Sequence, residues 1–256
     1  MTETITKPML VLEAHNGLSA LIVNKTPKYS GIWVSSLTHS ANKGLPDNEL
    51  VPLTDRIDLV REIKRLSTKP IIVDVDTLGG IEHIPFYIKA FEEAGAYAVV
   101  IEDKKYPKQN SLLEENSHQL EDVDSFCQKI QVSKGVAKDM KIIARLESLI
   151  AKHSMAEALI RAEAYVKAGA DMILIHSKQK IDCTEVMEFA KRFREISDVP
   201  LCAIPTTYVL PAEHPFEIVI TANHMLRASM KAMEKFANGE EVELSSVQDI
   251  FSLVGH

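Results

Sequence analysis

Acidic side chains follow two apolar runs of the chain and could together hold a metal ion. One run of buried-strand character ends in Asp74 and Asp76, and the next such run ends in Glu102. Carboxylates brought close together repel one another unless a cation or protons lie between them. Three oxygen ligands without a cysteine or a paired histidine favour Mg²⁺, so we expect these residues to bind it. The alternative is that two of them cap a helix or face solvent.

A charged loop comes directly after Glu102. It carries Lys104, Lys105 and Lys108, followed by Asn110 and Ser111. Loops at the carboxyl ends of parallel strands are where α/β proteins bind ligands. The polar stretch is too long for an ordinary barrel loop, and its composition predicts a gating loop over about residues 103–124 that covers an anionic, phosphorylated small molecule.

Two further strand ends carry groups that bind anions. Arg145 could clamp a carboxylate or phosphoryl group with two parallel hydrogen bonds, and His176 could donate to the same group. Arg145 could equally form an internal salt bridge with Glu147 or Glu102, and a lone histidine is often a satisfied core residue. The position of His176 at the end of an apolar run favours a functional role.

The only tryptophan of the chain, Trp33, ends another apolar run and is followed by hydroxyl groups. Backbone amides and hydroxyls of Ser35, Ser36 and Leu37 could hold a small carboxylate, with the indole shielding the ligand from water. A purely structural role for the tryptophan in the core carries equal weight. Asp47 lies in a turn-rich loop, where an aspartate needs no functional explanation.

These residues need a scaffold that brings strand ends together. Short β-branched runs alternate with amphipathic helical segments, which predicts a parallel sheet. Gly95 and Gly169 each follow a helical segment and are expected to cap it. Eight such units without a visible linker favour a single (β/α)₈ TIM barrel over residues 1–256. The expected strands are 9–12, 31–35, 70–74, 98–101, 142–146, 172–175, 201–204 and 218–222.

Composition narrows the function classes. The net charge of −7 argues against a nucleic-acid or membrane partner, and no stretch approaches the length of a membrane span. The three cysteines are scattered without metal-ligand spacing, which favours a reducing compartment, and we expect a cytoplasmic protein. No glycine-rich dinucleotide fingerprint, Walker loop or nucleophile elbow is present, so nucleophilic serine or cysteine hydrolysis has no support.

The chain resembles the phosphoenolpyruvate mutase branch of the isocitrate lyase superfamily along nearly its whole length. The matching segments are Glu13–Ala20, Gly31–Trp33, Asp74–Thr77, Glu102–Lys104, Pro107–Leu112, Ala144–Glu147, Ala168–Asp171, His176–Lys178, Pro205–Thr206 and Ala222–Ser229. The resemblance implies a (β/α)₈ barrel that acts on a small-molecule substrate and forms a homo-oligomer, a dimer or more usually a homotetramer with C-terminal helices swapped between subunits. It also implies an isomerase of phosphonate biosynthesis that interconverts phosphoenolpyruvate and phosphonopyruvate.

The resemblance also assigns roles to residues. Asp74 lies nearest Mg²⁺, and Asp76, Glu102 and Asp47 act through its waters. Ser35, Ser36 and Leu37 hold the pyruvyl part beneath Trp33, and Ser111 belongs to the same substrate site. Arg145, His176, Lys108 and Asn110 engage the migrating phosphoryl group, the last two from the gating loop.

Position 110 separates close relatives. The mutase pattern is Pro-Lys-x-Asn-Ser, whereas phosphonopyruvate hydrolases carry threonine in place of the asparagine; Asn110 therefore favours the mutase. Lyases of the superfamily, which cleave acids such as 2-methylmalate, carry a cysteine in this loop, and residues 104–117 hold none. A hydrolase, a lyase and a non-catalytic barrel stay open as alternatives.

Two features depart from the family. Ser36 stands where the family has glycine, and its side chain either perturbs the pocket or adds a donor. The sequence ends soon after Phe251-Ser252-Leu253, earlier than in single-domain relatives. This ending bears on the swapped helix and leaves open that the chain is one domain of a longer polypeptide.

Overall fold

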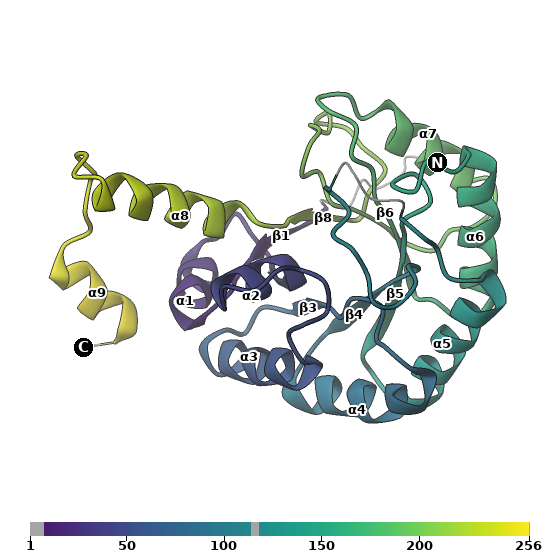
Figure 1. The fold of residues 1–256 in the computed structure, drawn as a ribbon, viewed down its shortest axis with the longest axis horizontal. Helices are drawn as coiled ribbons and strands as arrows, with labels where there is room; N and C mark the ends of the chain where they lie inside the picture. The colour runs from purple at the N-terminus through teal and green to yellow at the C-terminus, as the bar shows by residue number, and fades with distance from the viewer. Residues whose placement is uncertain (1–7, 114–117, 256) are drawn as a thin grey trace, which may run out of the picture.

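The apolar runs form eight parallel strands that pair in sequence order and close into a barrel (Figure 1). This computed structural model describes residues 8–113 and 118–255. The predicted (β/α)₈ fold is confirmed. The strands are β1 (Met9–Glu13), β2 (Gly31–Val34), β3 (Ile71–Asp74), β4 (Ala98–Glu102), β5 (Lys141–Leu146), β6 (Met172–Ile175), β7 (Leu201–Ala203) and β8 (Ile218–Thr221).

Helices surround the barrel, except for the last two, which leave it. They are α1 (Gly17–Lys25), α2 (Ser36–Asn42), α3 (Leu53–Leu66), a 3₁₀ turn (Ile81–His83), α4 (Ile84–Ala94), α5 (Val123–Val136), α6 (Met155–Lys167), α7 (Thr184–Phe193), α8 (His224–Ala237) and α9 (Val247–Val254). Among the described residues no helix combines the length and apolar character needed to cross a membrane.

The strands are apolar along their length because both of their faces are covered. Ile72, Val100 and Leu174 fill the barrel interior with Trp33, whereas neighbouring residues such as Val73 pack outward against the helices. Polar side chains are therefore confined to the strand ends. Gly95 and Gly169 follow α4 and α6 with φ of 95° and 105°, as their positions predict.

The last two helices leave the barrel. Figure 1 shows α8 pointing away from β8, with α9 folded back beside it, and we call these two helices and their linker the arm, residues 224–254. The arm starts at a fixed point, because the buried Glu13 carboxylate accepts hydrogen bonds from the amides of Met225 and Leu226 at 3.0 and 3.2 Å. Neither helix of the arm contains a buried residue.

The predicted gating loop of residues 103–124 follows β4 and leads into α5. Its base is a short antiparallel ladder: the Glu121 amide donates to the Asp103 carbonyl and the Lys105 amide to the Gln119 carbonyl, at 2.9 and 3.0 Å. Residues 114–117 of the predicted loop lie outside the described residues. The ladder holds the described part of the loop over the mouth of the barrel.

Candidate active site

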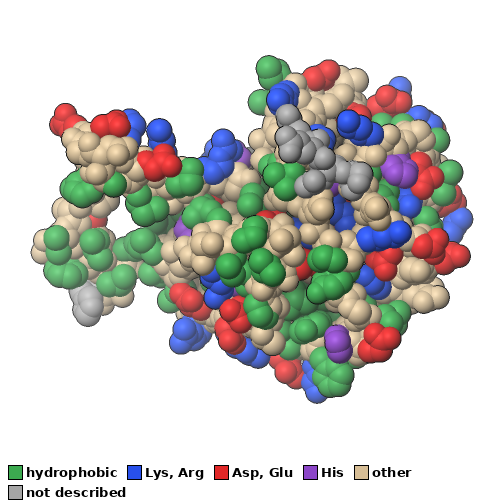
Figure 2. All heavy atoms as spheres, in the orientation of Figure 1, with side chains coloured by type: hydrophobic (Ala, Val, Ile, Leu, Met, Phe, Trp, Pro, Cys, Tyr) green, Lys and Arg blue, Asp and Glu red, His purple; other side chains and the backbone are tan. Residues whose placement is uncertain are grey.

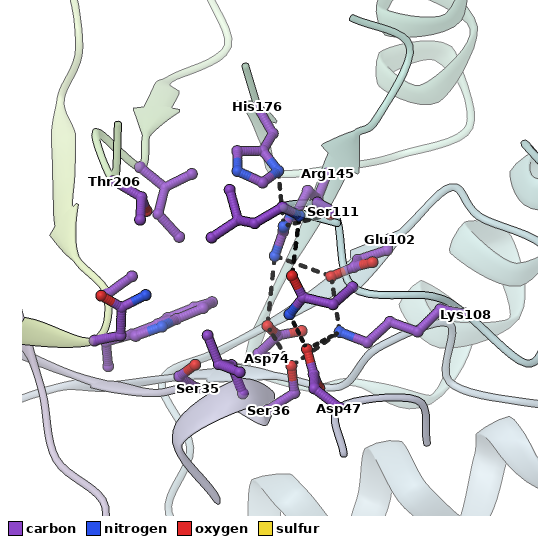
Figure 3. Close-up of a pocket in the computed structure, with 17 residues that line it drawn as sticks. Ser35, Ser36, Asp47, Asp74, Glu102, Lys108, Ser111, Arg145, His176 and Thr206 are labelled. Atoms are coloured by element: carbon purple, nitrogen blue, oxygen red, sulfur yellow. Dashed lines mark hydrogen bonds and ion pairs between the residues drawn. The ribbon is translucent and has the colours of Figure 1, made fainter. Parts of the chain in front are cut away.

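A cavity opens at the carboxyl ends of the strands, beneath the loop after β4 (Figure 3). Of the site residues predicted from the sequence, every one except Asp76 lines it: Trp33, Ser35, Ser36, Leu37, Asp47, Asp74, Glu102, Lys108, Asn110, Ser111, Arg145 and His176. The ends of β2 to β6 and the segments that follow β2 and β4 deliver these groups to one place, because parallel strands share a carboxyl edge.

The three predicted metal ligands converge at the floor of this cavity. Oxygen atoms of Asp74, Asp76 and Glu102 all lie within 4.8 Å of one another, and the three side chains are buried. Asp74 ends β3, and the backbone then turns through Asp76 at φ of 54°, a left-handed conformation that aspartate tolerates better than most residues. This turn lets both carboxylates reach the same edge.

Arg56 supports the turn from behind. Its guanidinium is fully buried, donates to Asp76 Oδ2 at 2.6 Å and donates to the Asp74 carbonyl at 2.9 Å. Burial would raise the pKa of Asp76, but Arg56 and Lys108 outweigh it and hold that pKa well below its usual range. Asp74 has weaker compensation, and burial raises its pKa to about 6. Asp76 is thus ion-paired with Arg56 and Lys108, whereas Asp74 lines the cavity.

A second cluster stands at the ends of β5 and β6. Arg145 donates from Nε to Glu147 at 2.6 Å, and its Nη1 lies 3.0 Å from Glu102 Oε1. His176 Nδ1 is 2.8 Å from Arg145 Nη2 and 2.7 Å from Glu147 Oε1. Burial lowers the pKa of His176, so the ring is neutral at pH 7. The salt bridges considered as an alternative for Arg145 are both present, and the residue lines the cavity as well.

The gating loop brings three polar side chains into the cavity. The Lys108 ammonium is buried among carboxylates, and the Asn110 amide donates to Asp47 Oδ2 at 2.6 Å. The Ser111 hydroxyl donates to Glu147 Oε2 at 2.6 Å. Asp47, ambiguous in the sequence, is therefore a buried partner of this loop. The loop therefore contacts a carboxylate on each side of the cavity, Asp47 and Glu147.

Several side chains that position the site were not predicted as site residues. Besides Arg56, they are Glu49, whose carboxylate accepts from the Lys108 amide at 2.7 Å, and Lys104, which lies 3.0 Å from Glu147. The sequence did not distinguish these charged residues from surface residues, because α3 and the loops contain many other charges that are exposed. Lys104, two residues after Glu102, is part of the predicted charged loop, but its burial depends on how the loop folds back.

The residues at the floor of the cavity fit a hard divalent cation. The donor set is purely carboxylate oxygen, which Mg²⁺ prefers. Asp47 Oδ1 is buried without a hydrogen-bond partner among the described residues, which leaves acceptor capacity for a cation or its waters, and Glu102 Oε2 lies 3.4 Å from the Lys104 ammonium. Asp74, Asp76 and Glu102 could hold the ion, with Asp47 at its edge.

Comparison with known proteins identifies the family of this chain. The family model described as phosphoenolpyruvate phosphomutase matches residues 3–239. The chain belongs to the phosphoenolpyruvate phosphomutase family. It is 35% identical to the phosphoenolpyruvate phosphomutase of Tetrahymena pyriformis, over 96% of this chain and 86% of that protein.

Relatives of this family carry different activities. The chain is 34% identical to a phosphonopyruvate hydrolase of Variovorax sp., over 95% of this chain and 89% of the relative. It is 31% identical to a 2-methylisocitrate lyase of Halalkalibacterium halodurans, over 87% and 74% of the two chains. These relatives are enzymes that act on small molecules, and the chain is similar to all three activity classes.

Solved structures agree with the fold. A crystal structure of phosphoenolpyruvate phosphomutase from Streptomyces platensis subsp. rosaceus superposes with a TM-score of 0.91 at 32% identity, over 98% of this chain and 91% of the other. A phosphonopyruvate hydrolase in complex with oxalate and Mg²⁺ superposes with a TM-score of 0.85 at 32% identity, over 97% and 90%.

Proposed function

We propose that this protein is a Mg²⁺-dependent phosphoenolpyruvate phosphomutase that makes phosphonopyruvate for phosphonate biosynthesis. The observation that carries the proposal is Asn110, which lines the cavity from the gating loop and donates to Asp47 at 2.6 Å. The mutase pattern has asparagine at this position, and its amide supplies a donor that a threonine side chain would not place in the same way.

The cavity suits the transfer of a phosphoryl group within one molecule. A loosely bound phosphoryl group needs cations and hydrogen-bond donors around its oxygens. Arg145 and His176 stand on one side of the cavity, and Asn110 and Ser111 approach from the loop (Figure 3). These four side chains would hold the phosphoryl group while it moves from the enol oxygen to the carbon.

The remaining walls serve the rest of the substrate. Trp33 and Leu37 offer apolar surface against a pyruvyl group, and Ser35 and Ser36 offer hydroxyls for its carboxylate. Mg²⁺ held by Asp74 with Asp76 and Glu102 would supply positive charge beside the oxygen that becomes an enolate. A closed gating loop would keep water from the phosphoryl group.

The test is ³¹P NMR of phosphonopyruvate incubated with the purified protein and Mg²⁺. We expect conversion to phosphoenolpyruvate, and we expect Asp74→Ala to abolish it. Free phosphate without phosphoenolpyruvate would identify a phosphonopyruvate hydrolase, the second candidate, which the 34% identity to such an enzyme favours. Release of pyruvate from a 2-methylmalate-like acid, with an unchanged phosphorus spectrum, would identify a lyase.

We also propose that the protein forms a homo-oligomer through the arm. Large apolar side chains of α8 and α9 are half exposed or more, among them Met233 (61%), Phe236 (61%) and Val247 (60%). Figure 2 shows hydrophobic side chains gathered on the arm, apart from the barrel. A face of this kind is stable in water when a second subunit covers it.

A further inference from the structure

The ammonium of Lys108 lies among the carboxylates predicted to bind the metal. Its Nζ is 2.7 Å from Asp76 Oδ1, 3.3 Å from Glu102 Oε1 and 3.3 Å from Asp47 Oδ2. It also donates to the Ser36 hydroxyl at 3.0 Å, and that hydroxyl donates to Asp74 Oδ2 at 3.0 Å. Figure 3 shows the lysine reaching this cluster from the opposite side to Asp74.

Because of these contacts, the Lys108 ammonium and a divalent metal ion would need the same carboxylate oxygens. Asp76 and Glu102 belong to the set of three ligands whose oxygens lie within 4.8 Å, and the third, Asp74, is linked to the ammonium through Ser36. The lysine is only 3% exposed, so water screens little of the repulsion between its charge and a divalent ion. These few carboxylate oxygens can bind either the ammonium or the metal ion, but not both at once.

We propose that Lys108 is a built-in competitor of the divalent cation, which must displace the ammonium from Asp76 and Glu102 in order to bind. The inference rests on the metal site of the proposed function. It gives the lysine two positions: among the carboxylates when the metal is absent, and turned into the cavity, toward the anionic substrate, when the metal is bound. Substrate and lysine then meet only in the metal-loaded protein.

The exchange requires the lysine side chain to move while the loop stays closed. The Lys108 backbone amide is held separately, by Glu49 Oε2 at 2.7 Å. Glu49 is itself fixed by the Thr77 amide and hydroxyl at 3.1 and 2.7 Å. None of these contacts involves the ammonium. Rotation about the four side-chain bonds of the lysine is therefore enough to vacate the site.

The first test is titration of Mg²⁺ alone onto the full chain by calorimetry, comparing Lys108→Met with Lys104→Met. Both changes remove a buried charge that contacts Glu102, but only Lys108 also contacts Asp76 and Asp47. We expect Lys108→Met to bind Mg²⁺ about tenfold tighter than the wild type, because the competing state is lost. We expect Lys104→Met to change the affinity much less.

The second test uses the wild type, so it does not depend on the folding of a variant. Acetylation of lysines by a small reagent is followed by mass spectrometry with and without Mg²⁺. We expect Mg²⁺ to raise the rate at Lys108 several-fold, while the exposed Lys105 on the same loop reacts equally in both conditions.

The outcomes separate this inference from the proposed function. Equal or weaker Mg²⁺ binding by Lys108→Met, or tightening no greater than in Lys104→Met, would overturn the competition and leave the metal site intact. An unchanged or lower acetylation rate at Lys108 would overturn it too. No Mg²⁺ binding by the wild type or either variant would overturn both the competition and the proposed metal site.

Discussion

At the scale of single residues, the site is a set of buried charges that compensate one another. Asp76 is satisfied by Arg56 and Lys108, and Glu147 by Arg145 and Lys104. Removing one member of such a pair leaves its partner charged and buried, which costs more than the pair contributes. Asn110 differs from these residues because it is neutral, so its replacement removes no buried charge.

Asn110→Ala should therefore lower the turnover of phosphonopyruvate by about 10²–10³, the typical cost of one lost donor at a transition state. The fold should be retained, since the Asn110 side chain donates one hydrogen bond to Asp47 and accepts one from the Leu112 amide. Activity is followed by ³¹P NMR and folding by circular dichroism. Gln109→Ala, at an exposed neighbouring position, is the control. Full activity in Asn110→Ala would refute its role.

Asn110→Thr introduces the hydrolase pattern at the same position. If the amide shields the phosphoryl group, this variant should release free phosphate where the wild type returns phosphoenolpyruvate. The ratio of the two products in the ³¹P spectrum measures the change. An unaltered ratio would mean that position 110 does not distinguish the two reactions.

At the scale of elements, one buried carboxylate fixes the start of the gating loop to β5 and α6. Asp103 accepts from the Glu147 amide at 2.8 Å and from the Tyr165 hydroxyl at 2.9 Å, and Arg161 Nη1 lies 3.4 Å away. The loop therefore leaves β4 in one direction, which brings Lys108 and Asn110 back over the cavity.

Asp103→Ala should destabilise the protein by about 1–3 kcal/mol, because it leaves the buried Glu147 amide and the Tyr165 hydroxyl without their acceptor, whereas Arg161 keeps its ion pair with Glu157. Urea unfolding measures the free energy. Asp103→Asn keeps an acceptor oxygen and should cost less. If both variants unfold at the wild-type urea concentration, the network does not support the loop.

The helix α2 gives the protein a pH dependence. Burial, helped by Arg56 and Lys43, lowers the pKa of His39 on this helix to about 4. The unfolded chain has the ordinary value near 6.5, so it takes up the proton first. The stability from neutral His39 is therefore complete above pH 6.5 and is lost as the pH falls towards 4.

His39→Gln removes this titration. The urea midpoint of the variant should fall less than that of the wild type between pH 7 and pH 4.5. Measuring both proteins at both pH values separates His39 from the other groups that titrate. Parallel losses in the two proteins would show that His39 does not contribute.

At the scale of the whole molecule, a single chain completes the barrel but does not cover the apolar side chains of the arm. The arm contacts the barrel near α1, where the Lys25 ammonium donates to the Ser252 carbonyl at 3.0 Å. Met225 at its start packs against the core, but the larger apolar side chains further along the arm, such as Met230, Met233 and Phe236, are at least half exposed, whereas those of the barrel helices pack on the strands. This difference motivates the oligomer proposal.

Charges placed on the arm should dissociate the oligomer. Met233→Glu combined with Phe236→Glu introduces buried charges into an interface but only exposed charges into a monomer. We expect light scattering to give a multiple of 28.5 kDa for the wild type and a single-chain mass for the variant. Phe86→Glu, at an exposed site on α4, is the control. A monomeric wild type, or a variant of unchanged mass, would contradict the proposal.

The sequence by itself determined the fold and most of the candidate site. β-branched runs alternating with amphipathic helices specify parallel strands, and parallel strands must present their carboxyl ends together. Because of that geometry, the sequence alone predicts that Asp74, Glu102, Arg145 and His176 lie in one cavity. The role proposed for Asn110 rests on the resemblance of its neighbours, Pro107 to Ser111, to the mutase pattern.

Only the tertiary structure decided which charges are partners. Arg56 and Glu49 read as ordinary surface residues, and nothing local marks them as supports of Asp76 and Lys108. The position of the Lys108 ammonium among the carboxylates likewise depends on a loop folding back across the barrel. Periodicity and strand ends are local properties of a chain, whereas ion pairs form between segments far apart in sequence, and their strength depends on burial that exists only after folding.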